Sequence, residues 1–109
     1  MAGGEIPKGA EMNKGWFYKP TVFSNVKPEH RIAKEEIFGP VLTVFTFEDI
    51  DELVAQANAT IYGLAAAIWT RDIARAHKLA RRLQAGTVWI NAYGSLAPES
   101  PFGGYKQSG

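Results

Sequence analysis

Cysteine is absent from this chain of 109 residues. Its absence excludes disulfide bonds, thiolate metal sites and a cysteine nucleophile among these residues. Histidine is nearly absent as well, because the sequence contains only His30 and His77. Two histidines without close companions do not make a metal site, so we expect no bound metal.

An excess of either charge is also missing, as are long hydrophobic runs. The 12 basic and 11 acidic residues leave a formal net charge of +1. Nothing in this balance attracts nucleic acid or an anionic membrane surface. No apolar run approaches the length of a membrane span, and residues 1–15 have no apolar core like that of a signal peptide. We therefore expect a cytoplasmic protein with no nucleic-acid or membrane partner.

The amino-terminal part of the sequence is irregular. Residues 1–15 are polar and glycine-rich, and we expect them to form a flexible amino-terminal segment. Residues 16–23 are aromatic and β-favouring, which predicts a strand. Pro20 within it cannot donate to a ladder, which favours an edge or a bend. Residues 31–37 are compatible with a short helical turn.

A regular alternation of elements follows. The predicted elements are a strand at residues 41–47, a helix after Asp49, a strand at 64–69, a helix after Thr70 and a strand at 87–91. Strands joined by such helices run parallel. The sequence therefore predicts the α/β class, as a three-layer-type parallel sheet fragment with a β-α-β-α-β core.

Helix boundaries have their own signals. Asp49 is expected to cap the first helix, with Glu52 three residues later as in a capping box. Thr70 is expected to cap the second helix, with Asp72 in its first turn. Gly86 stands where a left-handed helix cap belongs.

The predicted sheet is apolar on both faces, and two helices cannot cover both. This pattern predicts that the chain is incomplete by itself. We expect it to associate through the uncovered surface, either with itself or with further polypeptide.

Two segments carry candidate chemistry, although the chain has no G-x-G-x-x-G and no P-loop. Residues 34–41 place two carboxylates and an aromatic residue before a Gly-Pro bend. Residues 91–109 form a long Gly-, Pro- and Ser-rich stretch after a strand, where ligands bind in open parallel sheets. The alternatives are a solvated turn for the first segment and a mobile end for the second.

Several motifs together resemble aldehyde dehydrogenases, in the same order and at the same spacing. They are EEIFGPV at residues 35–41, NAT at 58–60, YGLA at 62–65, AGTVWIN at 85–91 and PFGGYKQSG at 101–109. The resemblance runs from about Gly15 to the last residue. It implies that residues 16–109 are part of the carboxy-terminal portion of a catalytic domain.

The resemblance implies roles for five residues. Glu36 is expected to accept hydrogen bonds from the nicotinamide ribose hydroxyls of NAD or NADP, since a carboxylate accepts two donors at once. Phe38 is expected to pack near the nicotinamide ring. Asn91 matches a position beside the active site, and Leu96 and Phe102 match positions lining the aldehyde tunnel. Leu96 departs from the aromatic residue that many relatives carry there.

In that family a cysteine thiolate attacks a small aldehyde, and a glutamate later activates water to release the acid. The resemblance places both residues, and the cofactor domain, upstream of the region matched here. We therefore expect no catalytic residue in this chain, no activity of the chain alone, and no tight binding of NAD or NADP by it. The alternatives are one half of a split enzyme completed by another chain, or a non-catalytic self-associating module.

Overall fold

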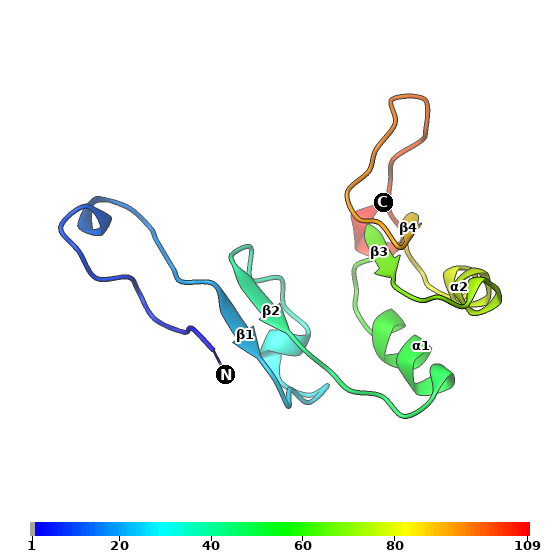
Figure 1. Ribbon diagram of the computed structural model, residues 1–109, viewed down its shortest axis with the longest axis horizontal. Helices are drawn as coiled ribbons and strands as arrows, with labels where there is room; N and C mark the ends of the chain where they lie inside the picture. The colour runs from blue at the N-terminus through cyan, green and yellow to red at the C-terminus, as the bar shows by residue number, and fades with distance from the viewer. Residues whose placement is uncertain (1) are drawn as a thin grey trace. The chain divides into compact units, whose positions relative to one another are not determined.

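The computed structural model describes residues 2–109, which form two compact units (Figure 1). The first unit comprises residues 2–46 and the second comprises Phe47–Gly109. Each unit is built around a sheet of two parallel strands.

The first unit contains η1 (Met12–Lys14), β1 (Thr21–Phe23), η2 (Arg31–Ala33) and β2 (Val41–Thr43). Strands β1 and β2 run parallel, with Thr21 opposite Val41. Parallel strands need a crossover rather than a tight turn, and η2 lies in that crossover. Thr21 is only 2% exposed. Its hydroxyl accepts a hydrogen bond from the Gly4 amide and donates one to the Lys19 carbonyl, both at 2.8 Å.

The amino-terminal segment pairs with β1. Ala2 forms an antiparallel bridge with Val22, with N–H···O distances of 3.0 and 2.9 Å. Lys19 donates its amide to the Glu5 carbonyl at 3.1 Å and forms an exposed ion pair with the Glu5 side chain at 3.3 Å. These contacts join residues 2–5 to the strand, while the flexibility expected of residues 1–15 stays a prediction.

The second unit contains α1 (Ile50–Asn58), β3 (Ala65–Ile68), α2 (Ile73–Ala80), β4 (Thr87–Ile90) and η3 (Lys106–Ser108). Strands β3 and β4 run parallel, with Ala65 opposite Thr87, and α2 connects them as a β-α-β unit. The buried hydrophobic residues are Ile68 on β3 and Ala76 and Leu79 on α2. The core of this unit therefore lies where α2 packs against β3.

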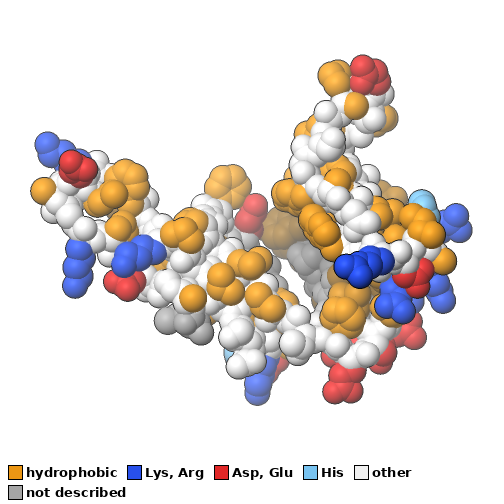
Figure 2. Space-filling model, viewed as in Figure 1, with side chains coloured by type: hydrophobic (Ala, Val, Ile, Leu, Met, Phe, Trp, Pro, Cys, Tyr) orange, Lys and Arg blue, Asp and Glu red, His pale blue; other side chains and the backbone are white. Residues whose placement is uncertain are grey.

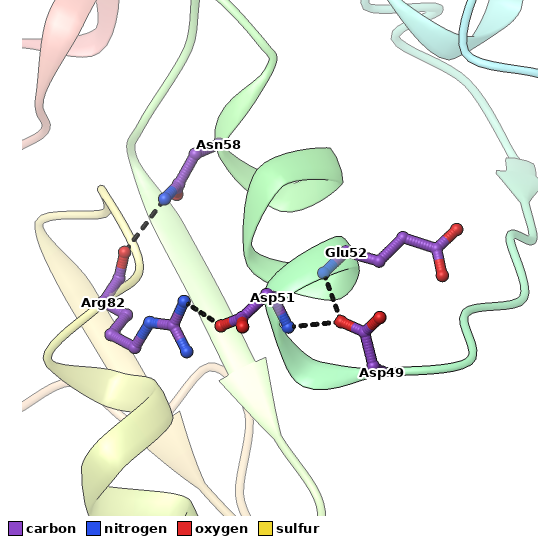
Figure 3. Close-up of polar contacts among 5 residues, drawn as sticks. All are labelled: Asp49, Asp51, Glu52, Asn58 and Arg82. Atoms are coloured by element: carbon purple, nitrogen blue, oxygen red, sulfur yellow. Dashed lines mark hydrogen bonds and ion pairs between the residues drawn. The ribbon is translucent and has the colours of Figure 1, made fainter.

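Helix α1 begins as the sequence predicts. The Asp49 carboxylate accepts hydrogen bonds from the amides of Asp51 and Glu52, both at 2.8 Å (Figure 3). The Glu52 side chain in turn accepts from the amide of Glu48 at 2.9 Å, one residue before the cap. Two amides that the helix leaves unpaired, and one just before it, are thereby satisfied.

Helix α2 begins later than predicted. Asp72, not Thr70, is its cap, and the Asp72 carboxylate accepts from the Arg75 amide at 3.0 Å. The Thr70 hydroxyl instead accepts from the Asp72 amide at 3.1 Å. Both residues are good caps by type, so the choice depended on where the chain leaves β3.

The prediction of a left-handed helix cap at Gly86 is also wrong. Its backbone is not in the left-handed region, so it is not the expected left-handed cap. The reason for glycine here is space, because any Cβ would collide with the carbonyl of Gly103. Its amide donates to the Gly63 carbonyl at 3.0 Å.

The α/β class and the parallel strands are confirmed, but the prediction of one sheet running through residues 41–91 is wrong. Strand β2 pairs with β1, and β3 pairs with β4, giving two separate sheets within residues 2–109. Strand β2 is also shorter than the predicted 41–47. The apolar run continues past Thr43, but its partner β1 ends at Phe23, and an apolar run does not identify the strand that pairs with it.

Among residues 2–109, no helix combines the length and the apolar character needed to cross a membrane. The same residues contain no group of three or more His, Cys, Asp or Glu side chains placed to hold a metal ion.

Candidate functional site

The first candidate segment is a turn that projects Phe38 outward. Phe38 has a φ of 53° and is 92% exposed. A left-handed backbone is uncommon for a bulky residue, and a fully exposed phenylalanine forgoes the burial that normally favours it. Neither feature helps this unit fold. Both are expected where a ring is held ready to contact something outside the unit.

Backbone hydrogen bonds fix the carboxyl side of this turn. The Val41 amide donates to the Gly39 carbonyl at 2.7 Å, which closes the bend. The Thr21 amide then donates to the Pro40 carbonyl at 2.9 Å. Because Thr21 begins β1, the backbone just after Phe38 is fixed to the sheet.

The two adjacent carboxylates of this segment differ in what they contact. Glu35 accepts two hydrogen bonds from the Arg31 guanidinium, at 2.9 and 2.8 Å. These hydrogen bonds hold the pKa of the Glu35 carboxyl below its usual range. Within residues 2–109, no side chain or backbone amide hydrogen-bonds to the exposed carboxylate of Glu36. Glu36 is therefore the carboxylate that is open to a ligand.

An open cleft of about 590 Å³ lies beside this turn. Aromatic side chains from residues 16–18 and 23 line it together with residues 37–41, including Phe38. Glu36 immediately precedes residues 37–41 in the sequence. A cleft lined by aromatic side chains suits a ligand that has a flat ring.

The second candidate segment begins at Asn91, just after β4. The Asn91 side-chain amide donates to the Thr70 carbonyl and accepts from the Thr70 amide, both at 2.9 Å. It thus bridges the carboxyl ends of β3 and β4. Its own φ of 52° turns the chain away from the sheet. Asn91 therefore fixes the backbone at the point where the loop leaves β4.

The loop that follows projects from the second unit (Figure 1, orange). Leu96 is 60% exposed and Phe102 is 54% exposed. Gly103 lies against Gly86 at the amino end of β4, whereas Asn91 follows the carboxyl end of the same strand. Residues 92–102 therefore run back past the whole length of β4, and the loop leaves and rejoins the sheet at opposite ends.

Residues 103–109 are joined to the rest of the second unit by several hydrogen bonds, while the alternative of a mobile end stays untested. The Tyr105 amide donates to the Gly63 carbonyl at 2.9 Å and the Gln107 amide to the Ile61 carbonyl at 3.1 Å. The Lys106 ammonium donates to the carbonyls of Asn58 and Thr60 at 2.7 and 2.9 Å. A cation suits this position, because the carbonyl end of α1 carries partial negative charge.

Asn58 is the last residue of α1, and its side chain has a further structural role. Its side chain donates to the Arg82 carbonyl at 2.9 Å (Figure 3). It also accepts from the Gln84 amide at 2.9 Å. Arg82 in turn forms an ion pair with Asp51 at 2.6 Å. These contacts join α1 to the segment after α2. The partners lie 24 to 31 residues apart, so no local pattern signals them.

The five residues singled out from sequence divide between the units. Glu36 and Phe38 lie in the first, and Asn91, Leu96 and Phe102 lie in the second. Their convergence on one cleft stays a prediction. The sequence did not indicate the structural roles of Lys106 and Trp89. Lys106 anchors the last residues to the end of α1, and the Trp89 indole hydrogen-bonds to the loop after β4.

Comparison with known proteins gives a consistent result. The model of the aldehyde dehydrogenase family matches residues 1–109. The betaine aldehyde dehydrogenase of Bacillus subtilis (strain 168) is 51% identical over 107 residues, covering 98% of this chain and 22% of that protein. Aldehyde dehydrogenase, cytosolic 1, of Rattus norvegicus is 58% identical over 97 residues, covering 89% of this chain and 19% of that protein.

Solved structures are similar as well. A betaine aldehyde dehydrogenase from Staphylococcus aureus in complex with NAD+ superimposes with a TM-score of 0.92 at 44% identity. The similarity covers 97% of this chain and 21% of that one. The chain thus spans about a fifth of the length of the relatives it matches.

Proposed function

The chain belongs to the aldehyde dehydrogenase family, and we propose that it forms part of the catalytic domain of an NAD(P)-dependent enzyme that oxidises an aldehyde to a carboxylic acid. The observation that carries this proposal is the family match across the whole of residues 1–109. The chain has no cysteine, so the nucleophile of this family comes from polypeptide outside this sequence.

Within that enzyme, the first unit contributes a contact to the cofactor. When bound, NAD(P)+ accepts the hydride released from the substrate. The chemistry of the turn fits the nicotinamide riboside end of this cofactor. Glu36 offers a carboxylate that can accept from two neighbouring ribose hydroxyls, and Phe38 offers an exposed ring surface. The closed Gly39-Pro40 bend keeps the backbone after them in one conformation, which positions both side chains.

The second unit contributes part of the wall of the aldehyde tunnel. Leu96 and Phe102 present apolar surface from the loop after β4, and Asn91 fixes the point at which this loop leaves the sheet. An apolar wall excludes water from the carbonyl carbon and favours aldehydes with a matching apolar surface.

The exposed apolar surface supports completion by further polypeptide. Figure 2 shows hydrophobic side chains (orange) on the visible surface of both units. The chain exposes 8704 Å², whereas a compact protein of 12.0 kDa exposes about 6000 Å². Even two separately compact bodies of this total mass would expose only about 7200 Å². We infer that the rest of the enzyme covers this additional exposed surface. We also infer a cytoplasmic location, because the name of the rat relative describes that protein as cytosolic.

A chimera tests the proposal. This chain replaces the matching segment of the Bacillus subtilis betaine aldehyde dehydrogenase, which supplies the remainder of an enzyme. The expected result is reduction of NAD+ on addition of betaine aldehyde or of an apolar aliphatic aldehyde, measured by the absorbance of the reduced nicotinamide. The unaltered host is the positive control. A chimera that is folded by circular dichroism, elutes like the host and produces no reduced cofactor would contradict the proposal.

A further inference from the structure

The loop after β4 is held at its base by one side chain. The indole N–H of Trp89 donates to the carbonyl of Ser95 at 2.7 Å, which is at the short end for an N–H···O hydrogen bond. The Trp89 ring also packs against Tyr93, with ring centroids 5.2 Å apart and planes at 60°. Trp89 lies on β4 and is half-buried, so its position is set by the sheet.

The chain between these contacts turns through a glycine. Gly94 has a φ of 74°, and no atom lies within 4 Å of the place where a Cβ would be. Glycine reaches this conformation at little steric cost but does not favour it over others. The direction of the turn therefore depends on the contacts around Gly94, which are those of Trp89.

Residues 92–102 have little else to hold them. Within residues 2–109, their only hydrogen bond to another part of the second unit is the one from Trp89 to Ser95. The other hydrogen bond in the loop is internal, from the Ser100 amide to the Ala97 carbonyl at 2.9 Å. Leu96 follows Ser95 directly, so the Ser95 carbonyl fixes the backbone that presents the Leu96 side chain.

We propose that Trp89 is a positioning residue for the aldehyde-contacting loop, which it holds through the indole hydrogen bond to the Ser95 carbonyl. This inference rests on the proposed function, because it assumes that Leu96 lines the aldehyde tunnel. Trp89 itself does not touch the aldehyde. It determines how tightly the enzyme binds substrates that reach Leu96.

The first test compares two substitutions in the chimera. Trp89→Phe keeps an aromatic ring beside Tyr93 and removes the N–H donor. Ser95→Ala removes a hydroxyl and keeps the carbonyl that accepts the bond, so it is the matched control. We expect Trp89→Phe to raise KM for betaine aldehyde about two- to tenfold, the range for loss of one such bond. We expect kcat to change by less than about twofold and Ser95→Ala to leave both constants unchanged.

The split between KM and kcat separates positioning from general damage. A variant that merely loses folded protein shows a lower apparent kcat at constant KM. The proposal is overturned if Trp89→Phe leaves KM unchanged, or if Ser95→Ala raises KM as much as Trp89→Phe does.

A second measurement does not require catalysis. Limited proteolysis with chymotrypsin, followed by mass spectrometry, reports cleavage within residues 92–102, with cleavage within α2 as the internal reference. We expect Trp89→Phe to speed cleavage in the loop several-fold and to leave α2 unchanged. Equal rates of loop cleavage in both proteins would overturn the proposal. A chimera without activity would contradict the proposed function, and this measurement would still decide whether Trp89 holds the loop.

Discussion

Neighbouring residues of the same type can have different tasks, and Glu35 and Glu36 are an example. The sequence places both carboxylates before the Gly-Pro bend and cannot separate them by residue type. The resemblance singles out Glu36, and the structure adds a physical reason for that choice. Glu35 is engaged by Arg31 through two hydrogen bonds, which leaves Glu36 as the carboxylate open to hydroxyl donors.

A substitution in the chimera tests this difference. Glu36→Gln replaces a charged acceptor of two hydrogen bonds by a neutral amide, and we expect kcat/KM for NAD+ to fall about tenfold. Glu35→Gln is the control, and we expect it to change kcat/KM for NAD+ by less than about twofold, because Glu35 faces Arg31 and solvent. Equal effects of the two substitutions would remove the role assigned to Glu36.

Titration provides a check on the Arg31–Glu35 pair itself. Its hydrogen bonds lower the pKa of Glu35, so the folded turn favours the carboxylate. The stabilisation is present above the carboxyl's usual pKa and is lost as pH falls through the lowered pKa. We expect Arg31→Ala to raise the pKa of Glu35 toward its usual value, measured by NMR of the side-chain carboxyl. Lys34→Ala, which removes a neighbouring charge outside the pair, should leave that pKa in place.

At the scale of elements, close approach of two backbones joins the last segment of the chain to β4. Gly86 precedes β4, and Gly103 lies against it with no room for a side chain. The sequence showed a glycine at a boundary and suggested a left-handed cap. A glycine can be required because the backbone has a positive φ or because a side chain would not fit. The sequence does not distinguish these two reasons, since it shows only that the residue is glycine.

Alanine substitutions separate the two glycines of this contact. Gly86→Ala forces its methyl group into the Gly103 carbonyl, and we expect a loss of about 1–3 kcal/mol in unfolding free energy. Gly103→Ala is the matched control, since its own Cβ would meet no atom within 4 Å. We expect it to cost less than about 1 kcal/mol. Urea unfolding of the chimera measures both, and equal losses would show that β4 and the returning segment do not pack as described.

At the scale of the whole molecule, exposed apolar surface is the dominant feature. The buried hydrophobic residues among residues 2–109 are Ile68, Ala76 and Leu79. Two of these side chains are large, whereas Ala76 contributes a single methyl group. A fully buried core of this size offsets little of the conformational entropy lost on ordering the chain. The chain therefore needs additional surface to pack against.

This shortage predicts how the isolated chain behaves. We expect it to self-associate or to remain largely unfolded at neutral pH, rather than to form a stable monomer. Size-exclusion chromatography with light scattering measures the mass, and circular dichroism measures the folded fraction. Addition of polypeptide carrying the remainder of a related enzyme should reduce self-association. A monodisperse, cooperatively folding monomer would contradict this expectation.

The sequence alone determined the features that depend on residues close together in the chain. The Asp49 cap follows from hydrogen bonds within a few residues. The parallel pairing of β3 with β4 follows from the helix that connects them. The family resemblance likewise follows from residue identity and order. Tertiary structure alone decided which strand pairs with β2 and which residue caps α2. It also decided that Trp89 holds the loop after β4 and that Lys106 holds the last residues of the chain. The pairing of β1 with β2 and the hydrogen bonds of Lys106 join residues far apart in the sequence, and a local pattern carries no information about a distant partner. The α2 cap and the Trp89 hydrogen bond are local, but they depend on where the chain leaves β3 and β4.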